Sequence, residues 1–362
     1  MAQHRVTLIP GDGIGPEITA AMQRVIKALD VSIEWETVEA GAHLLDTQGT
    51  PLPQSTIDSI KRNKVAIKGP VTTPVGTGFR SVNVALRKEL DLYVNLRPAF
   101  SMEGTGARYE HVDLVIVREN TEDLYAGIEF EEGSEQACEL ITFCAQKGAG
   151  VIRPDSGISL KPISVTGTRR IVTWAFEYAL ANNRERVCAV HKANIQKYSD
   201  GLFLRVAREV AEQYAGRVGF EDRIVDAACM GLVMNPQQFD VLVLPNLYGD
   251  IMSDLCAGMV GGLGIAPGAN IGKEYAVFEP VHGSAPQHAG KGIANPTALL
   301  LSASLMLDHL GERTASERLV AAVRAVIKEG KNVTYDVRRA LTGSVEGSVG
   351  TNEFTDAVIA LL

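Results

Sequence analysis

Apolar and polar positions alternate in a regular order along the first third of the chain. Short apolar runs at residues 6–9 and 65–68 predict buried strands, and residues 32–38 alternate as a third strand. Residues 18–29 and 54–62 have the apolar spacing of amphipathic helices. Strands that alternate with helices in this way predict an α/β protein with a mostly parallel sheet.

The same alternation continues to the C-terminal end, where an almost wholly apolar helix is expected to be buried. Further strands are predicted over residues 92–96, 113–117, 186–190, 222–227 and 240–244. Further helices are predicted over residues 84–90, 169–181 with a cap at 166–168, 199–214, 297–310, 315–329 and 353–362.

Two stretches depart from this pattern. Residues 131–165 have acidic turns, alternating apolar positions and a glycine break, but no strong helix signal. We interpret them as an inserted antiparallel element at which two subunits pair. Residues 261–272 are rich in glycine and predict a long loop.

Size and composition restrict the class of protein. A chain of 362 residues predicts two domains, and the buried C-terminal helix predicts that the last hundred residues return to the first domain. A net charge of −8 without a basic block argues against nucleic acid as a partner. The absence of a long apolar run and of a leader pattern argues against a membrane and predicts a cytoplasmic location. Five scattered cysteines predict reduced thiols.

Candidate chemistry concentrates first at residues 81–98. Arg87 and Arg97 lie ten positions apart, and Ser81 and Asn83 precede them. Guanidinium groups bind carboxylates, so the stretch predicts a pocket for a small acidic molecule. The alternative is a surface helix and strand whose two arginines are solvated.

A second group of candidates lies at predicted strand ends. Lys192 follows one strand, and Asp226 lies near the end of another. Asp250 and Asp254 are four residues apart on a predicted helix, so they share a face, and hard oxygen ligands favour Mg²⁺ or Mn²⁺. The alternatives are a solvated lysine and two exposed acids.

The glycine turn near the N-terminus does not predict a dinucleotide site. In G-D-G-I-G-P-E, the third glycine follows the second by two residues, so the G-x-G-x-x-G spacing fails. A P-loop is also missing, which disfavours phosphoryl transfer.

Taken together, the motifs resemble the β-decarboxylating dehydrogenases, which act on isocitrate, isopropylmalate, homoisocitrate or tartrate. The resemblance covers the whole chain, through G-D-G-I-G-P-E, K-G-P-V-T-T-P-V-G, L-R-K-E-L-D-L-Y-V-N-L-R-P, R-E-N-T-E-D-L-Y-A-G, H-K-A-N, N-L-Y-G-D-I-M-S-D and H-G-S-A-P. It implies a two-domain fold: a large domain of residues 1–92 and 261–362, a small domain of residues 93–125 and 165–260, and a clasp-like insertion at 126–164.

The resemblance also implies a substrate. Ser81 and Asn83 are similar to the small polar residues with which isocitrate-specific members bind a third carboxylate, and the long insertion resembles their clasp. We therefore expect oxidation and decarboxylation of isocitrate. The homoisocitrate, isopropylmalate and tartrate enzymes remain alternatives, as does a non-catalytic regulatory subunit.

The family's chemistry implies a role for each matching residue. Tyr125 would be the proton donor and Lys192 the base. The carboxylates of the substrate would be bound by Ser81, Asn83, Arg87, Arg97, Arg118 and Asn194, and Mg²⁺ or Mn²⁺ by Asp226, Asp250 and Asp254. In this family, the lysine and the first aspartate come from the neighbouring subunit, which implies a homodimer with shared active sites.

The coenzyme would lie along the second glycine-rich region. The resemblance implies contacts from Thr73, Glu279, His282, Gly283, Ser284, Ala285, Gln287, His288, Asn295, Tyr335 and Arg339. Gln287 and His288 match neither the NAD-type nor the NADP-type pair of the family. Ala294 is similar to the NAD enzymes, whereas Tyr335 and Arg339 are similar to the NADP enzymes. NAD is favoured, with NADP as the alternative.

Overall fold

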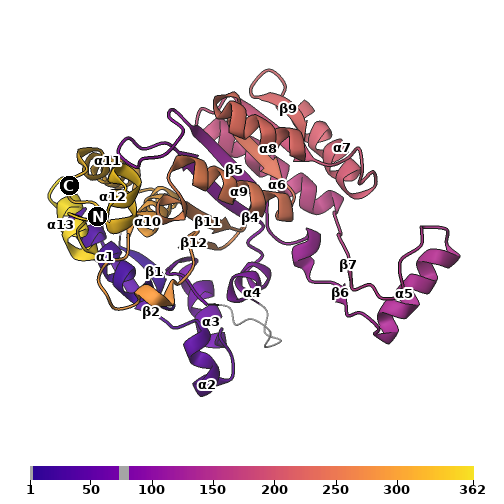
Figure 1. The fold of residues 1–362 in the computed structure, drawn as a ribbon, viewed down its shortest axis with the longest axis horizontal. Helices are drawn as coiled ribbons and strands as arrows, with labels where there is room; N and C mark the ends of the chain where they lie inside the picture. Colours follow the sequence, from indigo (N-terminus) through magenta and orange to yellow (C-terminus); the bar gives the residue numbers. More distant parts are fainter. Residues whose placement is uncertain (1–2, 73–80) are drawn as a thin grey trace.

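A single ten-stranded sheet forms the centre of the molecule (Figure 1). The computed structural model describes residues 3–72 and 81–362. The order of the strands is β2-β1-β3-β12-β11-β4-β5-β10-β8-β9. Their bounds are β1 (His4–Ile9), β2 (Ile33–Thr37), β3 (Val65–Lys68), β4 (Val94–Phe100), β5 (Asp113–Glu119), β8 (Arg186–His191), β9 (Gly219–Ile224), β10 (Val241–Leu244), β11 (Pro267–Ile271) and β12 (Ala276–Pro280).

Helices surround this sheet, so the predicted α/β fold is confirmed. They are α1 (Gly15–Ala28), α2 (Leu45–Gln48), α3 (Gln54–Asn63), α4 (Val82–Glu89), α6 (Val165–Ala181), α7 (Ser199–Glu212), α8 (Val225–Met234), α9 (Asn246–Val260), α10 (Thr297–His309), α11 (Arg313–Glu329), α12 (Tyr335–Thr342) and α13 (Thr351–Ile359). Within the described ranges, no helix is long and apolar enough to cross a membrane.

The two flanks of the sheet are parallel, whereas its centre is antiparallel. Strand β11 pairs antiparallel with β12 and β4, and β4 pairs antiparallel with β5. The prediction of a long loop at 261–272 is therefore wrong, because β11 occupies part of it. Glycine suits this strand because a Cβ on Gly268 would lie 3.0 Å from the carbonyl oxygen of Glu279.

The two ends of the chain lie together, as expected from the apolar helix near the C-terminus. Helix α13 packs on α1, and α10 packs on β11, β12 and α11. Leu299 and Leu300 of α10 are fully buried because neighbours cover the helix on several sides. One sheet continues through both predicted domains, and the domain boundaries stay a prediction.

The insertion projects from the body as an arm (Figure 1). Strand β6 (Glu129–Phe130) pairs antiparallel with β7 (Ile158–Ser159), which agrees with an antiparallel element. However, helix α5 (Glu135–Gln146) lies between them, so the absence of a helix was wrongly predicted. The Ser134 hydroxyl caps α5 by accepting the Ala137 N–H. The sequence pattern of α5 was hard to recognise as a helix because its apolar residues do not form a stripe that faces a core of this chain. Phe143, for example, is 55 % exposed.

Two local predictions also need correction. Strand β9 ends at Ile224, and Asp226 lies in the first turn of α8 instead of on the strand. Helix α6 is capped by Ser164, whose hydroxyl accepts the Gly167 N–H at 2.9 Å, and not by residues 166–168. Helix α12 was not predicted.

Candidate active site

Two buried arginines, Arg87 and Arg118, and the largely covered Arg97 lie beside the centre of the sheet. Arg87 lies on α4, Arg97 on β4 and Arg118 on β5. The antiparallel register pairs Asn95 with Arg118, which brings the two strands' arginines close together. Burial, together with the charges of Arg118 and Arg97, lowers the pKa of Arg87 to about 10. Desolvated like charges at this density favour an anionic ligand.

A small cleft opens over Arg87 and Arg97. Its volume is about 110 Å³, and Asn83, Arg87, Asn95 and Arg97 contribute to its lining. The Oδ1 atom of Asn83 is buried and has no hydrogen-bond partner among residues 3–72 and 81–362. A buried amide without a partner has a place for a ligand group. Ser81 lies at the N-terminal end of α4, directly before this lining.

A buried ion pair forms the floor of the cleft. Lys68 Nζ lies 2.6 Å from Glu279 Oε2, and Arg87 Nη2 lies 3.5 Å from Glu279 Oε1. Asn270 Oδ1 accepts the Nε–H of Arg87 at 3.0 Å. Burial raises the pKa of Glu279, but Lys68 and Arg87 lower it more, to about 2. Glu279 therefore stays ionised and fixes Arg87, and its predicted contact with a coenzyme stays a prediction.

Two carboxylates of α9 face the arginines. Arg118 donates to Asp250 Oδ1, and Arg97 Nη1 donates to Asp254 Oδ1 at 3.2 Å. The side chain of Asp254 is 55 % exposed, so it borders on solvent, while that of Asp250 is 34 % exposed. Burial raises the pKa of Asp250, but Arg118 and the other partners lower it more. The two acids thus pair with the arginine cluster.

Tyr125 joins the same cluster from the turn η2 (Asp123–Ala126). Its hydroxyl donates to Asp250 Oδ2, and the Arg118 guanidinium lies 4.7 Å from the centre of its ring. Burial and the hydrogen bond to Asp250 raise the pKa of Tyr125. The phenol therefore keeps its proton at neutral pH and can donate it.

Lys192 and Asp226 form a separate group. Lys192 follows β8, and its ammonium donates to Asp226, whose side chain is 68 % exposed. Asn194 is exposed in the same loop. In the described part of the chain, no hydrogen bond or ion pair joins this group to Asp250 or Asp254, and no three acidic, histidine or cysteine side chains gather at a common metal site.

The carboxylates of Asp226, Asp250 and Asp254 are ligands of the kind that a hard divalent cation binds. In the described part of one chain, however, the three do not lie at one site. Asp250 and Asp254 lie one helical turn apart and offer oxygen ligands of the kind that Mg²⁺ and Mn²⁺ prefer. Asp226 would have to come from a second chain, as the family resemblance implies.

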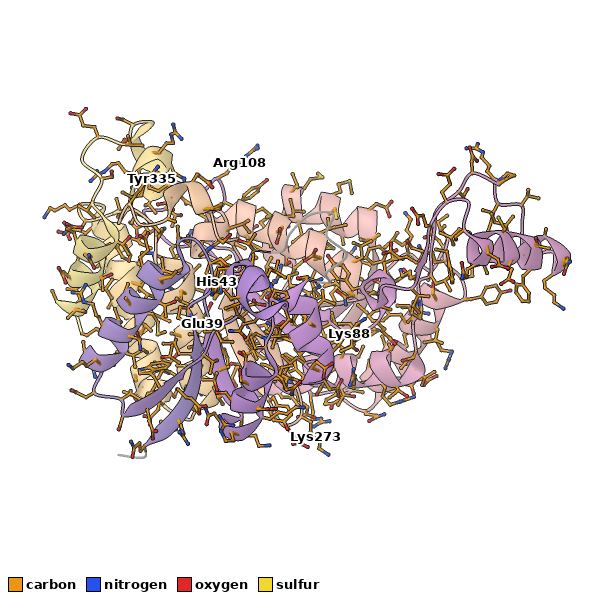
Figure 2. All side chains as sticks on the ribbon, turned by 90° about the horizontal axis from the view of Figure 1, so that it is seen from below. Glu39, His43, Lys88, Arg108, Lys273 and Tyr335 are labelled. Carbon is orange, nitrogen blue, oxygen red and sulfur yellow. The ribbon has the colours of Figure 1, made fainter. Side chains whose placement is uncertain are left out.

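A second pocket lies where the H-G-S-A-P loop meets α12. Its volume is about 320 Å³, and its lining includes Ile14, Gly283, Ala285, Asn295 and Tyr335. Figure 2 shows Tyr335 at the opposite end of the molecule from the projecting insertion. The pocket therefore lies far from the arm and beside the two ends of the chain.

Two histidines make this second pocket suitable for a polar ligand. His282 and His288 line it, and the buried atoms His282 Nε2 and His288 Nδ1 have no hydrogen-bond partner among the described residues. Burial lowers the pKa of His282, so its ring is neutral at physiological pH. These properties fit a nucleotide base and ribose.

The predicted coenzyme residues do not all face this pocket. Gln287 and Arg339 are exposed and are not part of its lining, and Ser284 is buried behind it. Thr73 lies outside the described residues. Asp336 was missed by the sequence analysis, although it lines the pocket and accepts the Asn295 Nδ2–H at 2.8 Å.

The N-terminal glycine turn contacts the backbone of the H-G-S-A-P loop that lines this pocket. The Ile14 N–H donates to the Ser284 carbonyl at 2.9 Å, and a Cβ on Gly13, at φ +61°, would lie 2.0 Å from that oxygen. Only glycine permits this approach and this conformation. The motif therefore acts as a backbone support for the H-G-S loop.

The sequence analysis also missed a layer of buried polar residues that fix the arginines. Asn246 Oδ1 accepts from Arg118 at 2.7 and 3.0 Å, and Ser253 Oγ accepts from Arg97 at 2.6 Å. The sequence contains one sign of this layer: Lys68 ends an apolar strand, and a charge that is buried there needs a partner.

Comparison with known proteins agrees with this geometry. Residues 5–358 match the family model for isocitrate/isopropylmalate dehydrogenase. A solved isocitrate dehydrogenase from Methylococcus capsulatus is similar, with a TM-score of 0.89, 48% identity and coverage of 99% of both chains.

The names of curated relatives differ in coenzyme and substrate. A probable mitochondrial NAD isocitrate dehydrogenase subunit alpha of Drosophila melanogaster is 47% identical over 99% of this chain and 87% of its own. An NADP isocitrate dehydrogenase of Archaeoglobus fulgidus is 44% identical over 96% of this chain and 90% of its own. A chloroplastic 3-isopropylmalate dehydrogenase of Solanum tuberosum is 47% identical over 90% of this chain and 86% of its own. The chain therefore belongs to the isocitrate/isopropylmalate dehydrogenase family.

Proposed function

We propose that this protein oxidises and decarboxylates isocitrate to 2-oxoglutarate and CO₂, with reduction of NAD. The observation that carries the proposal is a small cleft lined by Arg87 and Arg97, with Arg118 held next to them by its ion pair to Asp250 and with Asp254 paired to Arg97. Three fixed guanidinium groups match a substrate with three carboxylates.

The lining of the cleft favours isocitrate over isopropylmalate. Asn83 lines the cleft and its buried Oδ1 has no hydrogen-bond partner among the described residues, so an alkyl substituent bound there would lie beside an unsatisfied polar atom. A buried amide left beside an isopropyl group would lose its hydrogen bonds, which costs about 1–3 kcal/mol. Homoisocitrate, isopropylmalate and tartrate remain the alternative substrates.

The residues of the chain supply both proton transfers. Lys192 Nζ would accept the proton of the hydroxyl while the hydride leaves its carbon for the nicotinamide ring. After CO₂ departs from the resulting ketone, the Tyr125 hydroxyl would protonate the carbon that has lost it. A bound Mg²⁺ or Mn²⁺, held by Asp226, Asp250 and Asp254, supplies Lewis-acid stabilisation of negative charge on oxygen.

Exposed apolar side chains around Lys192 and Asp226 support a homodimer with shared sites. Tyr198 is 95 % exposed, Met234 is 76 % exposed, and Ile195 is also exposed. These side chains lie on the loop after β8 and on α8, the elements that carry the exposed lysine–aspartate pair. Apolar groups beside catalytic candidates suit a surface covered by a second copy.

NAD is the proposed coenzyme and NADP the alternative. Arg339, which suggested a 2′-phosphate site, is exposed and does not line the pocket of His282 and Tyr335, which favours NAD. The printed names of relatives include both coenzymes. The cytoplasmic location also stays a prediction, since the fly relative is named as mitochondrial.

The test is the appearance of reduced-nicotinamide absorbance with isocitrate and Mg²⁺, measured separately with NAD and NADP, with and without EDTA. We expect EDTA-sensitive reduction that is faster with NAD. Reduction with isopropylmalate or tartrate but not with isocitrate would contradict the proposal. Tight isocitrate binding without turnover would favour the regulatory-subunit alternative.

A further inference from the structure

A cluster of buried charges lies next to the predicted catalytic groups and has no role in the proposed reaction. Asp123 and Asp200 are fully buried, and Lys161 lies between them. Lys161 Nζ donates to Asp200 Oδ1 at 2.6 Å and to Gln196 Oε1 at 2.7 Å, and it lies 3.9 Å from Asp123 Oδ1. Buried carboxylates need a nearby cation, and Lys161 is the one that both share in the described structure.

One side of the cluster holds the predicted base. Asp200 lies in the first turn of α7, and its Oδ2 atom accepts the backbone N–H of Lys192 at 2.7 Å. Lys161 binds the other oxygen of the same carboxylate. The ammonium of Lys161 thus fixes the orientation of the carboxylate, and the carboxylate fixes the chain at the end of β8.

The other side of the cluster holds the predicted proton donor. Asp123 begins η2 with φ +66°, and its carboxylate accepts the N–H groups of Leu124 at 2.8 Å and Leu247 at 2.9 Å. The N–H of Asp123 donates to the carbonyl of Pro162 at 2.9 Å. This turn directs Tyr125 toward Asp250, and it is anchored to the residue after Lys161.

Lys161 itself is well fixed. Its side chain is 14 % exposed, and its ammonium lies 4.4 Å from the centre of the Tyr248 ring on α9. It belongs to the last residues of the 126–164 insertion, where the arm rejoins the body. The cluster therefore connects the arm, α7, α9 and the η2 turn.

We propose that Lys161 is a positioning residue that holds Lys192 and Tyr125 in place together and makes their geometry depend on how the insertion is seated. The inference rests on the proposed function and goes beyond it. Lys192 would serve the neighbouring subunit's site and Tyr125 its own, so one Lys161 would act on both sites of the dimer.

The first experiment replaces Lys161 and measures turnover and binding separately. Lys161→Met should lower kcat by about 10- to 100-fold, because small displacements of proton-transfer groups have effects of this size. KM for isocitrate should change by less than about twofold, since the arginines are untouched. Lys161→Arg should recover part of kcat. Lys331→Met, which removes a surface lysine paired with Glu329, is the matched control and should behave like the unmodified protein.

A readout independent of activity accompanies this experiment. Backbone hydrogen exchange in residues 122–127 and 191–196 should be faster in Lys161→Met and unchanged in Lys331→Met. Unchanged exchange in both segments, or an unchanged kcat, would overturn the proposal. If the unmodified protein oxidises none of the hydroxy acids, the proposed function fails, and the exchange measurement still decides on Lys161.

A double variant separates positioning from folding. Asp200→Asn removes one of the two buried charges that Lys161→Met leaves without a cation, the other being Asp123, and it keeps an oxygen for the Lys192 N–H. In Lys161→Met with Asp200→Asn, we expect Tm to recover in part while kcat stays low. If kcat recovers together with Tm, Lys161 only neutralises a buried charge, and the positioning role is wrong.

A hybrid dimer tests the action on both groups. A dimer of one Tyr125→Phe and one Lys192→Ala subunit would keep one competent site, built from the intact Tyr125 of one and the intact Lys192 of the other. Adding Lys161→Met to either subunit should lower the activity of the hybrid dimer. If the activity falls with the substitution in only one of the two subunits, Lys161 does not position both Lys192 and Tyr125.

Discussion

The predicted active-site residues fall into two regions that are held in opposite ways. Arg118, Asp250 and Tyr125 form a partly buried network in which each charged group has a partner. Lys192 and Asp226 form a single pair near solvent, beside exposed apolar side chains. The first region is preorganised within one chain, whereas the second is an exposed pair, which we propose a second copy covers.

The largest effect should come from inactivating one region in one subunit and the other region in its partner. Lys192→Ala and Tyr125→Phe should each lower kcat by about 10²- to 10⁴-fold, because each removes a proton-transfer group. Mixing the two variants should restore measurable turnover if the sites are shared. Steady-state kinetics on hybrids verified by mass spectrometry would show this, and verified hybrids without activity would contradict the sharing.

Disrupting the exposed apolar surface should also act on the second region. Met234→Glu places a charge at a side chain that is 76 % exposed in the isolated chain. Burying an unpaired charge at an interface costs several kcal/mol, so the variant should dissociate and lose activity at low concentration. Sedimentation velocity together with kcat would measure this. Val345→Glu, after α12 and 47 % exposed, provides a charge-matched comparison away from the arm and α8, and equal behaviour of both would place the interface elsewhere.

A smaller effect is expected from changing the specificity of the first region. Asn83→Leu should lower kcat/KM for isocitrate by about tenfold or more, because it removes a polar group from the cleft. The value for isopropylmalate should fall less or rise. Kinetics with both acids would measure the ratio. An unchanged ratio would show that Asn83 does not select the substrate.

The smallest functional effect, but a clear effect on stability, is expected at the floor of the cleft. Glu279→Gln leaves Lys68 and Arg87 without their carboxylate, which should lower the free energy of unfolding by about 3 kcal/mol at neutral pH. Because the pKa of Glu279 is lowered from 4.5 to about 2, its contribution is complete above pH 4.5 and is lost as the pH falls toward 2.

Denaturant unfolding across pH would follow this difference. The gap between Glu279→Gln and the unmodified protein should be constant near neutrality and should shrink below pH 4.5. A gap that does not depend on pH would contradict the assigned ion pair. Glu274→Gln, whose carboxylate pairs with Lys64 at the surface, is the control and should change stability little.

Local periodicity was enough to predict most strands and helices but not their partners. Residues 65–68 and 113–117 were recognised as strands because each holds a short run of apolar residues, and those residues are buried in the sheet. Strand β11 was missed because its glycine is required by a neighbouring backbone that is distant in sequence. Helix α5 was missed because its apolar face has no core in the same chain.

The sequence by itself determined which chemical groups are available: the arginines, the spaced pair Asp250 and Asp254, Tyr125 and Lys192. It also determined the α/β class, since strand and helix periods depend only on nearby residues. Only the tertiary structure decided which groups meet. The antiparallel pairing of β4 with β5 brings Arg97 and Arg118 together, and the return of Lys161 between Asp123 and Asp200 satisfies buried charges. Such contacts depend on desolvation and on chain segments that are far apart, and no local pattern contains that information.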